Sequence, residues 1–313
     1  MSAVGEADEL PHAVGSPTSW RESYGFELYD AASGLVGAAR IEVRPNEGAM
    51  DVDLSFFLED GGFVTARHVA PQSTNTAQLE VEGVRFSLLE PLRRWRVEYD
   101  GPCHSLASVA DAAKREAWHK SRLERLIVEL EFVAFQPAAA ATGADGFAQP
   151  GRWTGEIWVS GDRYVVAAPG LREKAWGAVA LPRMQRRFAL GFGDDRALDV
   201  VQTMLDDGPR LGGWIFRDGR SHAVREAELV TVTEPGSYHQ KAFRLGLVAA
   251  DGRRHEVAGE VLRVAPLPGL RGGHETMLCE GVTRARYDDR DGFGLAGYLH
   301  RLDAAGNPLE PVT

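Results

Sequence analysis

Carboxylates next to aromatic residues are the groups of this sequence whose types and spacing could do chemistry. Glu22 lies between Trp20 and Tyr24 along the chain, and Glu156 alternates with Trp158 so that the two share one face of a strand. A carboxyl group beside an apolar wall is held protonated more easily than in water, and aromatic faces tolerate developing cationic charge. Such groups could transfer protons to or from an apolar small molecule without a cofactor.

The turn-like sequence RPNEG contains the first choice of acid, Glu47. The turn joins two apolar strand patterns, so the carboxylate could lie at the mouth of a barrel, where partial desolvation raises the pKa of a glutamate toward neutrality. Arg44 could instead hold Glu47 ionised in a salt bridge, which lowers its pKa and makes it a base or a structural group. The sequence leaves both outcomes open. We predict that Glu47, Arg44, Trp95, Gln149 and Trp176 line or support one polar-tipped apolar pocket. The catalytic candidates are Glu47, Glu22 and Glu156, and the substrate-binding candidates are Trp20, Tyr24, Arg44, Asn46, Trp95, Gln149, Trp158, Arg172 and Trp176.

Composition excludes several classes of partner. The chain has 313 residues, is 44% hydrophobic and 26% charged, and carries a formal net charge of −10. It contains no block of lysines and arginines, so we expect no nucleic-acid partner and no anionic membrane surface. No apolar run approaches the length of about 18 residues that spans a bilayer, and the acidic N-terminus does not resemble a signal peptide. The sequence therefore predicts a cytoplasmic protein without membrane insertion.

Motifs for metals and cofactors are also absent from the sequence. No glycine-rich phosphate loop, G-x-S-x-G elbow or H-E-x-x-H pattern occurs, and the nine histidines never lie at ligand spacing. Cys103 and Cys279 are far apart in sequence, which favours two reduced thiols. We therefore expect no metal ion and no organic cofactor.

Strand patterns dominate the chain from Tyr24 onward, which indicates an all-β fold. Residues 50–58 alternate between apolar and polar side chains, as expected for a half-buried antiparallel strand. A tight hairpin is predicted at Glu82-Gly83 and another around residues 160–162. One helix is expected, over residues 108–126, because that stretch is rich in helix-forming residues and opens with a serine that could cap it.

The strand rhythm restarts after Gly177, which indicates a second domain. Turn signals of the Asp-Gly type recur through the C-terminal half, at the spacing of an all-β domain. The first residues mix Gly, Pro, Ser and acidic side chains without periodicity. We therefore predict a mobile tail over residues 1–18 and two β-barrel or sandwich domains, over 19–177 and 178–313, with one or two short helices in all.

Five short sequences stand out in order along the chain: W-x-E-S-x-G-F at 20–26, RPNEG at 44–48, PLRRWRVEYDGP at 91–102, Gln149-Pro150 and Trp176-Gly177. Together they resemble a bacterial family of tandem lipocalin-like proteins related to carotenoid hydratases (hydroxyneurosporene synthases), kievitone hydratase and some pericyclic cyclases. The resemblance covers residues 20–305. The resemblance implies two barrel-like domains with an apolar ligand cavity in or between them.

Two motifs depart from the family pattern. Relatives often carry H-Y-E-Q where residues 146–149 read GFAQ, and R-D-H-S-W-G where residues 172–177 read REKAWG. If the missing His, Glu and Asp carry acid–base work in relatives, this chain has lost that work or moved it to Glu173, Lys174 or another carboxylate.

Three classes of function are compatible with these observations. The first is a cofactor-independent lyase or isomerase, such as a hydratase or cyclase, that acts on a terpenoid, steroid or polyketide by proton transfer. The alternative is a lipocalin-type binding or carrier protein for a hydrophobic ligand, which agrees with the lost motif residues. A structural or interaction module is a third option, and whether the chain forms a homodimer is left open.

Overall fold

The computed structural model describes residues 4–72, 79–141 and 145–312, and nearly all of them belong to β-strands. The chain divides into two compact units, which are described separately. The first comprises the described residues of Met1–Ala107 and Lys120–Val179, and the second those of Ser108–His119 and Ala180–Thr313. The predicted boundary after Gly177 lies close to this division, but Ser108–His119 groups with the second unit.

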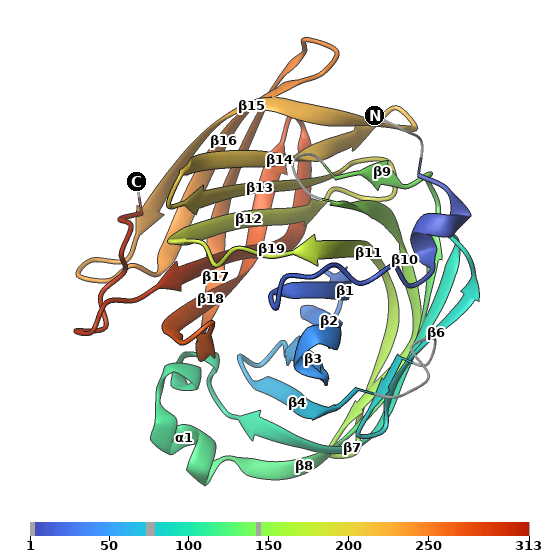
Figure 1. Cartoon of the computed structure of the whole chain (residues 1–313), viewed down its shortest axis with the longest axis vertical. Coiled ribbons are helices and arrows are strands. Elements are labelled where there is room, and N and C mark those ends of the chain that lie inside the picture. Colours follow the sequence, from blue (N-terminus) through green and yellow to red (C-terminus); the bar gives the residue numbers. More distant parts are fainter. Residues whose placement is uncertain (1–3, 73–78, 142–144, 313) are drawn as a thin grey trace. The chain divides into compact units, whose positions relative to one another are not determined.

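The first unit is built around one large antiparallel sheet (Figure 1). Its strands follow the order β4-β3-β2-β1-β11-β10-β8-β7-β6-β5, and a short pairing of β4 with β7 joins the two sides of the sheet into a ring. Its elements are η1 (Glu6–Glu9), β1 (Trp20–Asp30), β2 (Leu35–Arg44), η2 (Pro45–Glu47), β3 (Ala49–Phe57), β4 (Phe63–Pro71), β5 (Leu79–Val81), β6 (Val84–Glu90), β7 (Arg94–Leu106), β8 (Arg122–Ala134), β9 (Ala139–Ala140), β10 (Asp145–Val159) and β11 (Asp162–Ala178).

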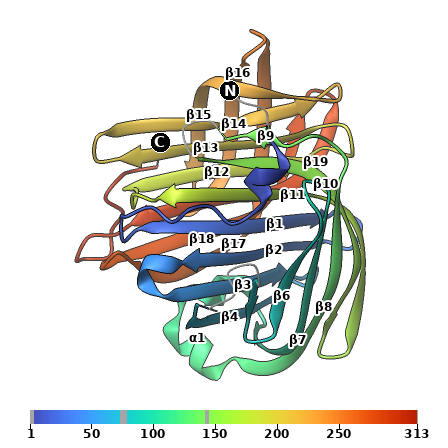
Figure 2. The same cartoon turned by 45° about the vertical axis from the view of Figure 1, so that its right-hand side comes forward.

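The second unit is a closed barrel in which each strand pairs with the next and β19 pairs with β12 (Figure 2). The closed pairing leaves no free sheet edge within the barrel. Its elements are η3 (Val109–Ala113), α1 (Arg115–Lys120), β12 (Met184–Gly191), β13 (Ala197–Leu205), β14 (Gly208–Arg217), β15 (Arg220–Thr233), β16 (Gln240–Ala249), β17 (Arg254–Arg271), β18 (His274–Tyr287) and β19 (Arg290–Arg301). The all-β prediction is confirmed.

Alternating side chains and turn residues explain the strands of the first unit. Within β3, Met50, Val52 and Leu54 are buried in the core, as their spacing predicts. Glu82 and Gly83 connect β5 to β6 with positive φ angles of 47° and 84°, the conformation of a two-residue hairpin turn. The same geometry recurs in the turn between β10 and β11, so both hairpins are found where the sequence predicted them.

The predicted helix over residues 108–126 is much shorter than expected. The structure has η3, then the six-residue helix α1, and β8 already begins at Arg122. Leu126 and Val128 alternate into the core of the first unit, where β8 pairs with both β7 and β10. Pairing and burial along this strand therefore override the helix preference of the residues that precede it.

His300 lies fully buried on β19 in the second unit, and neither of its ring nitrogens has a hydrogen-bond partner among the described residues. Burial, with a smaller effect of His239, lowers the pKa of His300 from 6.5 to about 4. Between these two pH values the imidazole of His300 is protonated in the unfolded chain but neutral in the folded chain. The free energy of unfolding therefore falls as the pH drops from about 6.5 to about 4.

We expect this effect to reach roughly 3 kcal/mol at the acid end, from about 1.4 kcal/mol for each unit of pKa difference. Urea unfolding of wild type and His300→Phe at neutral pH and near pH 4 measures it. The variant replaces the imidazole with an apolar ring that does not titrate. Parallel pH profiles for the two proteins would contradict the assignment.

Candidate functional site

Three neighbouring strands of the first unit bring charged and aromatic side chains to one face. Tyr24 on β1 pairs across the sheet with Lys174 on β11, which pairs with Phe147 on β10. Two residues from Lys174 along β11, Arg172 lies on the same face and pairs with Gln149 on β10. Because side chains alternate along a strand, these residues all point to the same side of the sheet. Both Arg172 and Lys174 are buried.

Arg172 is held in a fixed position by Gln149 and by aromatic rings. Its Nε donates to Oε1 of Gln149 at 2.8 Å, and its guanidinium lies 5.0 Å from the ring centre of Phe147 and 6.0 Å from that of Trp95. The amide nitrogen of Gln149 in turn donates to the carbonyl of Leu92 at 2.9 Å. The two terminal nitrogens of Arg172 are therefore presented as a rigid fork.

Lys174 and Glu22 form a second buried ion pair beside this fork. Nζ of Lys174 lies 2.9 Å from Oε1 of Glu22, 4.8 Å from the ring centre of Tyr24 and 5.7 Å from that of Trp176. Desolvation lowers the pKa of Lys174, and the charge of Glu22 opposes this shift. Burial raises the pKa of Tyr24, and the charges of Glu22 and Glu9 raise it further. The tyrosine therefore stays protonated while the lysine releases its proton more readily than in water.

The fork of Arg172 is occupied by a carboxylate from the beginning of the chain. Glu9 on η1 accepts hydrogen bonds from both terminal nitrogens of Arg172, at 2.8 and 2.7 Å, and is only 2% exposed. The backbone N–H of Leu92 donates to the same carboxylate at 2.7 Å. Leu92 has a φ of 55°, which is strained for a leucine, and both its N–H and its carbonyl serve this cluster.

Residues 4–19, here called the N-terminal segment, make three further hydrogen bonds with the charged side chains, through Leu10 and His12. The carbonyl of Leu10 accepts from Lys174 Nζ at 2.6 Å. His12 binds Glu22 through its backbone N–H at 3.2 Å and through Nδ1 at 2.9 Å. Its ring stacks on Trp176 with 3.7 Å between the ring centres. A mobile tail was predicted for residues 1–18; within it, Glu9, Leu10 and His12 make the polar contacts given above, and residues 1–3 lie outside the described residues.

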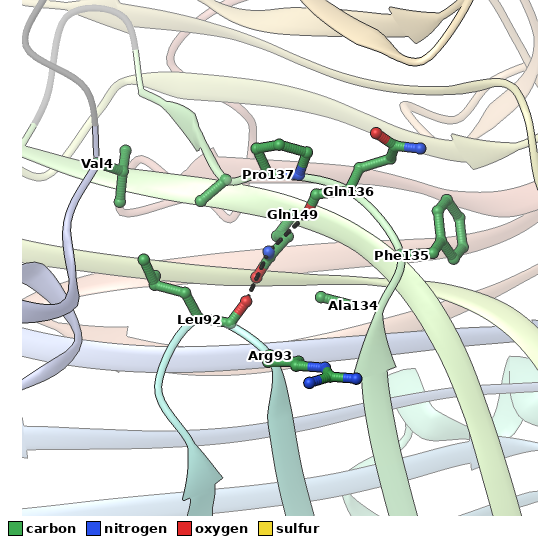
Figure 3. A pocket seen from close by; sticks show the side chains of 9 residues that line it. Val4, Leu92, Arg93, Ala134, Phe135, Gln136, Pro137 and Gln149 are labelled. Carbon is green, nitrogen blue, oxygen red and sulfur yellow. Dashed lines mark hydrogen bonds between the residues drawn. The ribbon is translucent and has the colours of Figure 1, made fainter.

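A pocket of about 420 Å³ lies beside this cluster (Figure 3). It shares Gln149 and Leu92 with the Arg172 site, and in Figure 3 the Gln149 side chain bridges the Leu92 and Gln136 carbonyls. Most of its lining is apolar, so it could hold the hydrocarbon part of a small molecule. The lining residues are Val4, Leu92, Arg93, Ala134, Phe135, Gln136, Pro137, Ala138 and Gln149.

Six of the residues predicted from the sequence meet in this cluster, whereas Trp20 and Asn46 lie along the N-terminal segment. Asn46 donates to the carbonyls of Gly15 and Pro17 at 2.8 and 2.7 Å, and a side chain at Gly15 would collide with the Trp20 ring. Those brought together are Glu22, Tyr24, Trp95, Gln149, Arg172 and Trp176.

The structure does not bring the two other catalytic candidates to the cluster. Glu47 has a side chain that is 37% exposed and forms a salt bridge with Arg44, which also binds Asp51. Glu156 binds Arg163 and accepts from Trp158 Nε1 at 3.2 Å, and the hydrogen bond from Arg163 lowers its pKa. Glu47 lies in the exposed turn η2, and Glu156 lies near the end of β10 with a partly exposed side chain.

Replacing Glu47 with Gln is therefore expected to change the free energy of unfolding by less than about 1 kcal/mol, as for most exposed ion pairs. Chemical denaturation measures this, with Arg44→Gln as the matched partner variant. A fall of several kcal/mol in the free energy of unfolding would contradict the assignment of an exposed ion pair, and loss of ligand binding would show that Glu47 belongs to the site.

Glu9, His12 and Phe147 belong to the cluster but were missed from the sequence, and Lys174 was named only as an alternative. The available signal was the strand alternation of β11, which places two cations on the buried face. Buried cations require buried carboxylates, and this requirement points to acidic partners elsewhere in the chain.

The described residues contain no group of three or more His, Cys, Asp or Glu side chains placed to hold a metal ion. No helix in the described part of the chain is long and apolar enough to cross a membrane.

Solved structures of low sequence identity share the fold. An AttH-type protein of Nitrosomonas europaea has a TM-score of 0.64 at 11% identity, with 93% of this chain and 98% of that chain covered. Kievitone hydratase of Nectria haematococca has a TM-score of 0.64 at 10% identity, covering 95% and 93%. CghA has a TM-score of 0.58 at 10% identity, covering 90% and 88%. The resemblance to lipocalin-like hydratases and cyclases is therefore confirmed for the fold.

A search of curated proteins found no match. A family model described as a domain of unknown function (DUF7064) matches residues 5–301, which is nearly the whole chain. The chain therefore belongs to the DUF7064 family.

Proposed function

We propose that this protein is a cofactor-independent lyase or isomerase of the hydratase or cyclase type, and that Glu22, Lys174 and Arg172 do the chemistry. The observation that carries the proposal is a buried row of three charged side chains, Glu22 on β1 and Lys174 and Arg172 on β11. This row lies beside the rings of Tyr24 and Trp176. Buried ionisable groups are destabilising unless paired, and they concentrate at functional sites.

The three charged groups have complementary roles. Glu22 removes a proton from a carbon next to a carbonyl group of the ligand, the ammonium of Lys174 stabilises the negative charge that develops on the carbonyl oxygen, and Arg172 orients the ligand. Lys174 then donates a proton, either to a leaving hydroxyl group, which departs as water, or to another carbon, which gives an isomer. The proton on Glu22 returns to the neutral amine across their 2.9 Å contact, and the site is regenerated. The hydration of an alkene is the reverse of the first path.

The pKa of Lys174 suits this role. Its lowered value, which burial causes, makes the ammonium a better acid than an exposed lysine. The fold shared with kievitone hydratase supports a hydratase reading, since the name of that protein states a hydration reaction.

One observation favours the alternative, a carrier protein for a hydrophobic ligand. Each of the three charged side chains has a partner within the chain itself, as in a site that is only structural. The two functions predict different fates for a bound molecule.

The test starts with organic extraction of the protein purified from its native host and mass spectrometry of the extract. The extracted molecule is purified and incubated with fresh protein. An enzyme of this class converts it to a species that differs by one water, or to an isomer of equal mass with a different retention time. Recovery of the pure molecule unchanged, with no new species formed, would support the carrier and contradict the enzyme.

A further inference from the structure

The contacts of the N-terminal segment match the charged side chains one by one. Glu9 binds Arg172, the Leu10 carbonyl binds Lys174 and His12 binds Glu22. A single stretch of four residues therefore neutralises or satisfies every charged group of the row. Such matching is what a bound ligand would provide.

Apart from its contacts with these charged side chains, the N-terminal segment is held by the stacking of His12 on Trp176 and by hydrogen bonds from Asn46 to the Gly15 and Pro17 carbonyls. The side chains of Leu10 and Val14 are 52% and 51% exposed, so the segment gains little from apolar burial. Apart from Glu9, no described residue from Val4 to Ser19 is buried. Its attachment depends on polar contacts, which a ligand with the same groups can replace.

The best-formed of these contacts is the receptor for the Glu9 carboxylate. Three donors meet it, two from Arg172 and one from the Leu92 backbone, all within 2.8 Å. The fork is fixed by Gln149 and flanked by Trp95, whose buried indole nitrogen has no hydrogen-bond partner among the described residues. Planar bidentate geometry of this kind selects a carboxylate over a single anionic oxygen.

We propose that Arg172, Gln149 and the Leu92 amide form a binding site for the carboxylate of an apolar ligand, and that Glu9 occupies this site as a displaceable internal ligand. The apolar pocket that shares Gln149 and Leu92 receives the hydrocarbon part. Displacement also frees Lys174 and Glu22 to face the ligand. The proposal places the substrate of the proposed enzyme among apolar carboxylic acids and to that extent rests on the proposed function, but it is tested by binding alone.

Decanoate and decanol are suitable probes because they share a chain length and differ in the carboxylate. Hydrogen exchange of the full chain is followed by mass spectrometry over residues 5–12. We expect saturating decanoate to speed amide exchange there at least about tenfold, while decanol leaves it unchanged. Arg172→Gln should abolish the decanoate effect.

Glu9→Gln tests the competition directly, and Glu6→Gln is its matched control because Glu6 is exposed on the same short helix. Removing the internal carboxylate should tighten decanoate binding about tenfold, since the site is then vacant more often. Glu6→Gln should bind as wild type does. Equal effects of decanoate and decanol, or decanoate binding that neither releases residues 5–12 nor tightens in Glu9→Gln, would overturn the proposal. A failed turnover assay with intact displacement would instead count against the enzyme alone.

Discussion

Glu22→Gln is expected to lower the free energy of unfolding by about 3 kcal/mol or more at neutral pH. The substitution removes the carboxylate that faces the buried ammonium of Lys174 and leaves that charge without a counterion, which typically destabilises by about 3–5 kcal/mol. Because Glu22 opposes the downward shift of the Lys174 pKa, the variant should lower that pKa further. The deficit should therefore narrow as the pH rises, since a neutral amine needs no counterion. Urea denaturation at several pH values measures both effects.

The double variant Glu22→Gln/Lys174→Met is the control for this prediction. It replaces the ion pair by neutral side chains of similar size, so it should recover most of the stability that Glu22→Gln loses. Equal stability of the single and double variants would show that the loss of Glu22 does not leave Lys174 as an uncompensated buried charge. A single variant as stable as wild type would mean that the pair is not buried in solution.

Turnover should fall at least about 100-fold in the same double variant, which is the usual contribution of a positioned acid or base. The neutral pair keeps the fold and the shape of the site but can neither accept nor donate the transferred proton. Conversion of the extracted ligand, followed by chromatography, measures the rate. Glu156→Gln is the matched control, because this carboxylate also lies beside a tryptophan but is paired with Arg163 away from the site.

Ligand affinity should be retained in the double variant within about tenfold, since Arg172 and the pocket are unchanged. A variant that binds and converts ligand at the wild-type rate would remove Glu22 and Lys174 from the chemistry. A variant that binds no ligand would assign the pair to binding.

Much of the fold was predictable because local patterns and final packing agree. Met50, Val52 and Leu54 alternate into the core, and Glu82-Gly83 adopts the turn that its residue types favour. The predicted helix over 108–126 failed where they disagree. Residues from Arg122 onward pair with β7 and, from Leu126 onward, also with β10, and local helix propensity cannot predict this long-range pairing.

The site was predictable only where it lies on strands. The spacing of Glu22 and Tyr24 places them on one face of a strand. The REKAWG motif at 172–177 contains Arg172 and lies on the strand that pairs with it. Glu9 and His12 lie in a stretch with no periodicity, so no local pattern assigns them a face. The role of Glu9 follows from Arg172, 163 residues away in sequence, and that of His12 follows from Glu22 and the ring of Trp176.

Incorporation of solvent deuterium tests the central claim most directly, because it detects proton transfer even when the overall reaction is at equilibrium. The ligand extracted from the protein is incubated in D₂O with wild type or with Glu22→Gln/Lys174→Met and then analysed by mass spectrometry. The proposed chemistry predicts deuterium bound to carbon with wild type and at least about 100-fold slower incorporation with the variant. Ligand that stays free of carbon-bound deuterium with wild type, or that exchanges equally fast with both proteins, would contradict acid–base catalysis by Glu22 and Lys174.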